Sequence, residues 1–91
     1  MYTLVWTSGF ARAAGKVFKQ HPDLREKFAV ILNDLERDLF QPHLRYHHLV
    51  GKLKGVQAIS ITSSYRLTLT LLISDKEVIL LDVGSHDGVY R

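Results

Sequence analysis

Residues 59–71 read ISITSSYRLTLTL and alternate between apolar and polar side chains. A period of two predicts β-strands with one buried face and one polar face. The apolar residues before and after residues 62–64 all have odd numbers. If the two strands bury the same face, the loop between them must contain an odd number of residues. The sequence therefore predicts two strands joined by a three-residue hairpin loop at 62–64. Ser60 and Arg66 then lie together on the open, polar face.

Two further strands are predicted on either side of this hairpin in the chain. Residues 77–83 are apolar at both parities, which is typical of a strand in the middle of a sheet. A turn near residues 74–76 leads into it, and a polar tail follows from Gly84. Residues 2–6 are short and rich in β-forming side chains, and they predict an N-terminal strand.

The segment between the first strand and the hairpin predicts two amphipathic helices. Ser8 is the expected N-cap of the first helix, and Asp23 with Glu26 the expected capping box of the second. Pro22 separates the helices, and Gln41-Pro42 is expected to end the second. The apolar stripes at helical spacing are Phe10, Ala13, Ala14, Val17 and Phe18 in the first helix, and Leu24, Phe28, Ile31, Leu32, Leu35 and Leu39 in the second.

The element order is strand, helix, helix, strand, strand, strand. This order predicts one α+β domain over residues 1–91, in which a helical hairpin packs on one face of a mainly antiparallel sheet. The chain contains no cysteine, which excludes disulfides and thiolate nucleophiles. We find no signal peptide and no apolar run long enough for a bilayer, so we expect a cytoplasmic protein without a membrane partner.

The charges are unevenly distributed, although the net charge is only +3. No acidic residue lies between Asp38 and Asp75. This stretch holds the basic residues Arg45, Lys52, Lys54 and Arg66, and the histidines His43, His47 and His48. An acid-free basic segment suits a polyanion such as RNA. A solvated basic face on an ordinary domain explains the charges equally well.

Two short segments carry side chains suited to chemistry. Residues 43–55 are expected to form a loop, and its segment 47–55, HHLVGKLKG, contains two glycines and two lysines. Residues 84–87, GSHD, put His86 just after the last strand, where imidazole could exchange protons near neutral pH. Tyr90 could stack on a base. Taken alone, each signal is weak, because a lone histidine is more often a surface or hydrogen-bonded residue.

Together the segments HHLVGKLKG (47–55), SYRL (64–67) and LLDVGSHDGVY (80–90) resemble the RelE/ParE toxin superfamily, and within it the YafQ-type messenger-RNA interferases. The resemblance covers nearly the whole chain. It implies a RelE-like fold and a toxin of a type II toxin–antitoxin pair. Many such toxins enter the ribosomal A site and cut the messenger RNA there. They need no metal or other cofactor, because the 2′-hydroxyl of the RNA is the nucleophile.

The resemblance also implies roles for particular residues. His86 and His47 match catalytic histidines of YafQ-type enzymes, and Arg66 matches the strand arginine of RelE-type members. The expected RNA-binding residues are Lys52, Lys54, Tyr90 and His48. The chain departs from the YafQ pattern at Ser60, where a histidine is expected, and at Ser64, where an aspartate is expected. These serines cannot act as acid or base at neutral pH.

Other functions remain open at this point. A ParE-like toxin acting on DNA gyrase would share the fold without needing His86, and an inactive remnant would only bind an antitoxin. A metal site built from His43, His47, His48 and His86 is less favoured, because few carboxylates lie nearby in the sequence. For the toxin hypotheses, the expected partner is an antitoxin encoded by a neighbouring gene, with an acidic segment that folds on binding.

Overall fold

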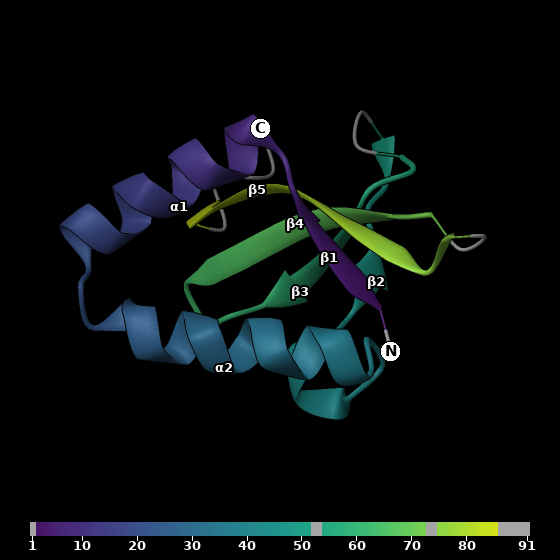
Figure 1. Cartoon of the computed structure of the whole chain (residues 1–91), viewed down its shortest axis with the longest axis horizontal. Coiled ribbons are helices and arrows are strands. Elements are labelled where there is room, and N and C mark those ends of the chain that lie inside the picture. Colours follow the sequence, from purple (N-terminus) through teal and green to yellow (C-terminus); the bar gives the residue numbers. More distant parts are fainter. Residues whose placement is uncertain (1, 52–53, 73–74, 86–91) are drawn as a thin grey trace.

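The computed structural model describes residues 2–51, 54–72 and 75–85. These residues form a five-stranded sheet in the order β1-β5-β4-β3-β2, together with two helices (Figure 1). The elements are β1 (Thr3–Trp6), α1 (Ser8–Gln20), α2 (Leu24–Arg37), the 3-10 helix η1 (Pro42–Leu44), β2 (His47–His48), β3 (Gln57–Ser60), β4 (Tyr65–Leu72) and β5 (Glu77–Ser85). The expected α+β class is confirmed, with one short strand, β2, in addition.

The hairpin between β3 and β4 has the predicted register. Ser60 lies opposite Arg66, and the Ile61 N–H donates to the Tyr65 carbonyl at 3.0 Å. Residues 62–64 are therefore the connecting loop. The pairings β2–β3, β3–β4 and β4–β5 are antiparallel, and only β1 joins β5 in parallel. The sheet is thus mainly antiparallel, as expected.

Strand β5 lies between β1 and β4, and it contains an irregularity that the sequence pattern hid. Thr68 pairs with Asp82, but the next residue of β4, Leu69, pairs with Leu80. Leu81 is therefore the extra residue of a β-bulge. Because of the bulge, the buried residues are even-numbered before it, at Val78 and Leu80, and odd-numbered after it, at Val83. This change explains why Val83 is buried although its number is odd, whereas Ile79 and Leu81 are half-buried. The strand also continues to Ser85, two residues beyond the expected end.

One core cluster joins the two helices to the sheet. Its buried members are Phe10, Ala14 and Val17 of α1, Phe28, Ile31 and Leu35 of α2, Leu39 and Leu44 of the following connection, Ile61 of the hairpin loop, and Ile59, Leu67, Leu69, Val78, Leu80 and Val83 of the sheet. The odd-numbered residues Ile59, Leu67 and Leu69 of β3 and β4 face this core, as the alternation predicts. Their even-numbered neighbours Ser60, Arg66 and Thr70 are half-buried on the opposite, polar face.

The helix ends differ from the sequence prediction. Thr7, not Ser8, is the N-cap of α1: its hydroxyl accepts from the Phe10 N–H at 3.1 Å and donates to the Leu80 carbonyl at 2.8 Å. This cap also ties α1 to β5. The expected capping box at α2 is absent, because the Asp23 backbone is helical and its side chain makes no cap bond. Helix α2 ends at Arg37, so Gln41-Pro42 is not its end.

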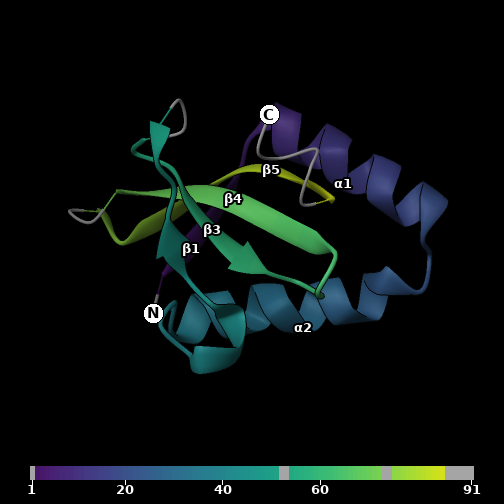
Figure 2. The same cartoon turned by 180° about the vertical axis from the view of Figure 1, so that it is seen from behind.

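The connection after α2 is ordered, although residues 43–55 were expected to be a loop. Leu39 and Leu44 are fully buried in the core. The Gln41 side-chain amide donates to the carbonyls of Asp34 and Asp38 at 2.9 and 3.1 Å. This connection forms η1 and enters β2 beside β3 (Figure 2). A sequence pattern fails here because one helical turn and a two-residue strand are too short to show a period.

No helix in the described ranges is long and apolar enough to cross a membrane.

We predict that Leu44→Ala lowers the free energy of unfolding by about 2–5 kcal/mol, the usual cost of truncating a fully buried leucine. Val30→Ala, at a side chain on α2 that is 55% exposed, should change the free energy by less than about 0.5 kcal/mol. Urea unfolding followed by circular dichroism measures both. Similar small losses for the two variants would show that η1 is not anchored through Leu44.

Candidate active site

A pocket of about 290 Å³ opens at the hairpin end of β3 and β4. The lining residues come from η1 and its C-cap, from β3 and β4, and from the loop between these strands. They are His43, Arg45, Ser60, Ile61, Thr62, Ser63 and Arg66. Two guanidinium groups, one imidazole and three hydroxyls thus meet in one place. Such a set of donors suits a phosphate group.

Arg66 is held in the pocket by the hairpin loop. Its Nη1 donates to the carbonyl of Thr62 at 2.8 Å and lies 3.3 Å from those of Ser63 and Tyr65. Within the described residues, Nη1 donates every hydrogen bond of this guanidinium. A guanidinium has five N–H donors, so Nε and Nη2 remain to bind an anion in a fixed orientation.

His43 forms a hydrogen bond with Asp34 at the side of the pocket, and this contact becomes an ion pair when the imidazole is protonated. Its Nε2 lies 2.8 Å from the Asp34 Oδ2 on α2. The His43 side chain is 50% exposed and the Asp34 side chain 20%. An ion pair this exposed typically stabilises a fold by only about 0.2–1 kcal/mol. Its main effect is therefore to fix the direction of the imidazole ring.

Arg45 and His47 are connected through the backbone. The Nδ1 of His47 lies 2.8 Å from the Arg45 carbonyl, and because a carbonyl only accepts, Nδ1 must donate. Arg45 itself has a left-handed backbone with φ of 53°. A non-glycine residue in this region is uncommon and costs stability, which is a frequent feature of functional sites. His47 pairs with Ala58, which is two residues before Ser60 in β3 and on the same face, so His47 lies on the polar face near the pocket without lining it.

His48 lies on the other face of the sheet, because successive side chains of a strand alternate. Its ring packs against that of Tyr46 at 5.6 Å, and its Nδ1 lies 3.3 Å from the amide nitrogen of Gln57. Burial, together with the nearby Tyr2 hydroxyl, raises the pKa of Tyr46. The structure thus does not bring His48 to the pocket that holds Arg66.

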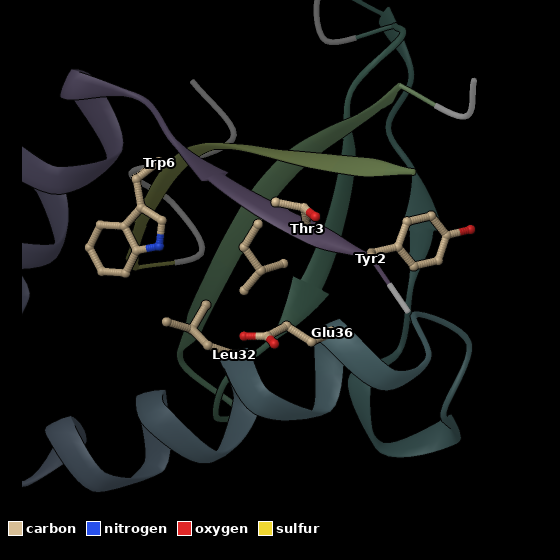
Figure 3. Close-up of a pocket in the computed structure, with 6 residues that line it drawn as sticks. Tyr2, Thr3, Trp6, Leu32 and Glu36 are labelled. Carbon is tan, nitrogen blue, oxygen red and sulfur yellow. The ribbon is translucent and has the colours of Figure 1, made fainter. Parts of the chain in front are cut away.

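A second hollow, of about 480 Å³, lies between β1 and α2. Figure 3 shows Leu32 and Glu36 on α2, across from Tyr2 and from Thr3 and Trp6 of β1. The Tyr2 N–H donates to the Glu36 carbonyl at 2.9 Å at one end. Among the described residues, this hollow is lined by aliphatic and aromatic groups, two hydroxyls and one carboxylate, without a cationic side chain. The hairpin pocket is therefore the better candidate for acid–base chemistry on an anion.

No family model and no curated protein sequence matches the chain. Solved structures match nearly all of it. YafQ from E. coli strain BL21(DE3) is 16% identical, with 100% of each chain covered and a TM-score of 0.82. The E. coli DinJ-YafQ toxin-antitoxin complex matches at 17% identity over 99% of this chain and 98% of that one, with a TM-score of 0.80. A copper-bound mutant toxin from Helicobacter pylori is 27% identical over 98% and 99%, with a TM-score of 0.76.

The chain has the fold of the RelE/YafQ-type toxins. The resemblance drawn from the sequence motifs is thereby confirmed at the level of the fold. Of the residues that the resemblance selected, Arg66 lines the pocket, His47 lies beside it, and Lys54 is exposed in the turn after β2. Lys52, His86 and Tyr90 lie outside the described residues.

The end of β5 lies beside the start of β4, close to the pocket. Ser85 pairs with Tyr65, and Gly84 pairs with Arg66. Ser85 is the residue before His86 in the sequence. Of the two serines where the sequence resemblance led us to expect a histidine and an aspartate, Ser60 lines the pocket and Ser64 is exposed in the hairpin loop.

Sequence reasoning missed three groups near the site. Arg45 was counted only as part of a basic segment, and His43 only as an unlikely metal ligand. Asp34 was placed on a helix, and only the fold of the connection brings it to His43. Asp82 is exposed on β5, opposite Thr68, so the polar face also carries an acid. In the described part of the chain, no three His, Asp or Glu side chains form a group that could hold a metal.

Proposed function

We propose that this protein is the toxin of a type II toxin–antitoxin pair and a metal-independent endonuclease that cuts messenger RNA on the ribosome. The observation that carries the proposal is the pocket in which Arg45, Arg66 and an imidazole meet on a RelE/YafQ-type fold. The Arg66 guanidinium, held by the hairpin loop, and the nearby Arg45 suit a phosphodiester, and the imidazole suits proton transfer. Such a protein would act in the cytoplasm.

The proposed chemistry divides among few residues. The RNA 2′-hydroxyl attacks the adjacent phosphorus, and Arg66 and Arg45 stabilise the charge that develops on the phosphate oxygens. Positioning of the RNA by these cations and by Lys52 and Lys54 lowers the barrier further. His86 protonates the leaving 5′-oxygen. Tyr90 would stack on a base, and His47 would supply a proton-transfer group at the edge of the pocket.

The proposed partner is an antitoxin, as DinJ is for YafQ in the matched complex. The described part of the acid-free segment between Asp38 and Asp75 carries Arg45 and Arg66 at the pocket and Lys54 exposed in the turn before β3. An acidic segment that folds over this surface would neutralise it and block access of RNA. Binding of the neighbouring gene product, lost at high salt, is the expected behaviour.

RNA binding should weaken with salt through Arg66 and Lys54. Each lost phosphate contact lowers the slope of log affinity against log salt by about one unit. We therefore expect Arg66→Ala and Lys54→Ala each to reduce that slope in titrations of programmed ribosomes at several salt concentrations. Lys16→Ala, on the exposed side of α1, is the control and should leave it unchanged. Equal slopes for all the proteins would remove Arg66 and Lys54 from the phosphate site.

Cleavage should depend on His86. His86→Gln keeps a polar side chain but cannot transfer a proton, so the single-turnover rate on programmed ribosomes should fall by about 10²–10⁴-fold. Binding to the antitoxin should persist. If the folded variant cuts at the wild-type rate, the acid is another residue. If the wild-type protein arrests growth without cutting RNA, a ParE-like action on gyrase replaces this proposal.

A further inference from the structure

We propose that His43 is the general base of this reaction and that Asp34 is the residue that positions it. The inference rests on the proposed RNA cleavage and assigns a proton acceptor in the same pocket. The assignment does not use the two positions where the resemblance expects a histidine and an aspartate, because this chain has Ser60 and Ser64 there. A serine hydroxyl cannot accept a proton at neutral pH, so the attack of the 2′-hydroxyl needs a base from elsewhere in the pocket.

The hydrogen bond with Asp34 determines which ring nitrogen of His43 can act as a base. A carboxylate only accepts hydrogen bonds, so the Nε2 of His43 must carry the proton in its 2.8 Å contact with Asp34 Oδ2. In the neutral ring, Nδ1 is then the lone-pair nitrogen. Within the described residues Nδ1 has no hydrogen-bond partner, and His43 lines the pocket. Nδ1 is thus the atom available to accept a proton from RNA.

The backbone around His43 is firmly anchored. Leu44, the next residue, is fully buried, and its N–H donates to the Gln41 carbonyl at 3.0 Å. The Gln41 side chain in turn donates to the Asp34 carbonyl at 2.9 Å. The 3-10 turn that carries His43 is therefore bonded to the same helical turn that carries Asp34. A base held in one orientation is ready for the reaction without reordering.

The proton and bond changes balance in one step. Nδ1 of His43 takes the proton from the 2′-hydroxyl as O2′ bonds to phosphorus and the P–O5′ bond breaks. The 5′-oxygen takes a proton from the acid, assigned above to His86. The products are a 2′,3′-cyclic phosphate and a 5′-hydroxyl. During the step His43 becomes an imidazolium, and the Asp34 carboxylate stabilises its charge, as the aspartate of a Ser-His-Asp triad does.

The test is single-turnover cleavage of message on programmed ribosomes by His43→Gln. The glutamine amide can still donate to Asp34, but it has no titratable nitrogen. We expect the rate near neutral pH to fall by about 10²–10⁴-fold, and the limb of the pH–rate profile that reports the base to disappear. Asp34→Asn should lower the rate about 10-fold or more, because the neutral amide cannot stabilise the imidazolium.

A chemical rescue separates a base from a structural residue. Added imidazole should restore part of the activity of His43→Ala, whereas it should not help Arg66→Ala. His21→Gln, at an exposed histidine between α1 and α2 that does not line the pocket, is the matched control and should cut at the wild-type rate. Antitoxin binding and circular dichroism report folding for every variant.

The outcomes distinguish this inference from the proposed function. If wild type cuts and folded His43→Gln cuts within about threefold of its rate, His43 is not the base, and RNA cleavage still stands. Loss of activity in His43→Ala without any imidazole rescue, and with an unchanged pH profile in His43→Gln, would also overturn the inference. If wild type does not cut RNA at all, the proposed function fails and the inference fails with it.

Discussion

The packing of β3 and β4 against the two helices fixes the register on which every side chain of the pocket depends. Ile59, Leu67 and Leu69 are fully buried on the helix side, and they hold Ser60 opposite Arg66 on the other side. A slip of one residue would move these three side chains into solvent and Arg66 into the core. Burial of a guanidinium without a partner is strongly unfavourable, so the hairpin has one stable register.

The second constraint is the connection after α2. Leu39 and Leu44 are buried in the same core, and between them the chain turns from the end of α2 to the edge of the sheet. Burial of Leu44 leaves its neighbours His43 and Arg45 exposed at the pocket. The chemistry of the site thus comes from two segments that are distant in the sequence: the hairpin supplies Arg66, and the connection supplies an imidazole and Arg45.

The sequence predicts the parts of this structure that repeat with a period. The alternation over residues 59–71 predicts the hairpin, its three-residue loop and the face of Arg66, because burial selects one parity. It does not predict the bulge at Leu81. A single extra residue interrupts the alternation, so the sequence of β5 looks like a strand that is apolar on both faces. The alternation also misses β2 and η1, which are too short to show a period. The pairing of His43 with Asp34 depends on that unpredicted connection, and so it could not be found from spacing.

The proposed function depends most on one property of the pocket: it acts on a ribose 2′-hydroxyl beside a phosphate held by Arg66 and Arg45. The direct measurement is the chemistry of the ends produced on programmed ribosomes with chelator present, together with cleavage of a message that carries one 2′-deoxynucleotide at the cut. The account predicts a 2′,3′-cyclic phosphate and a 5′-hydroxyl, and no cut at the deoxynucleotide. Cleavage of the deoxy message at the normal rate, or a 5′-phosphate product, would contradict it.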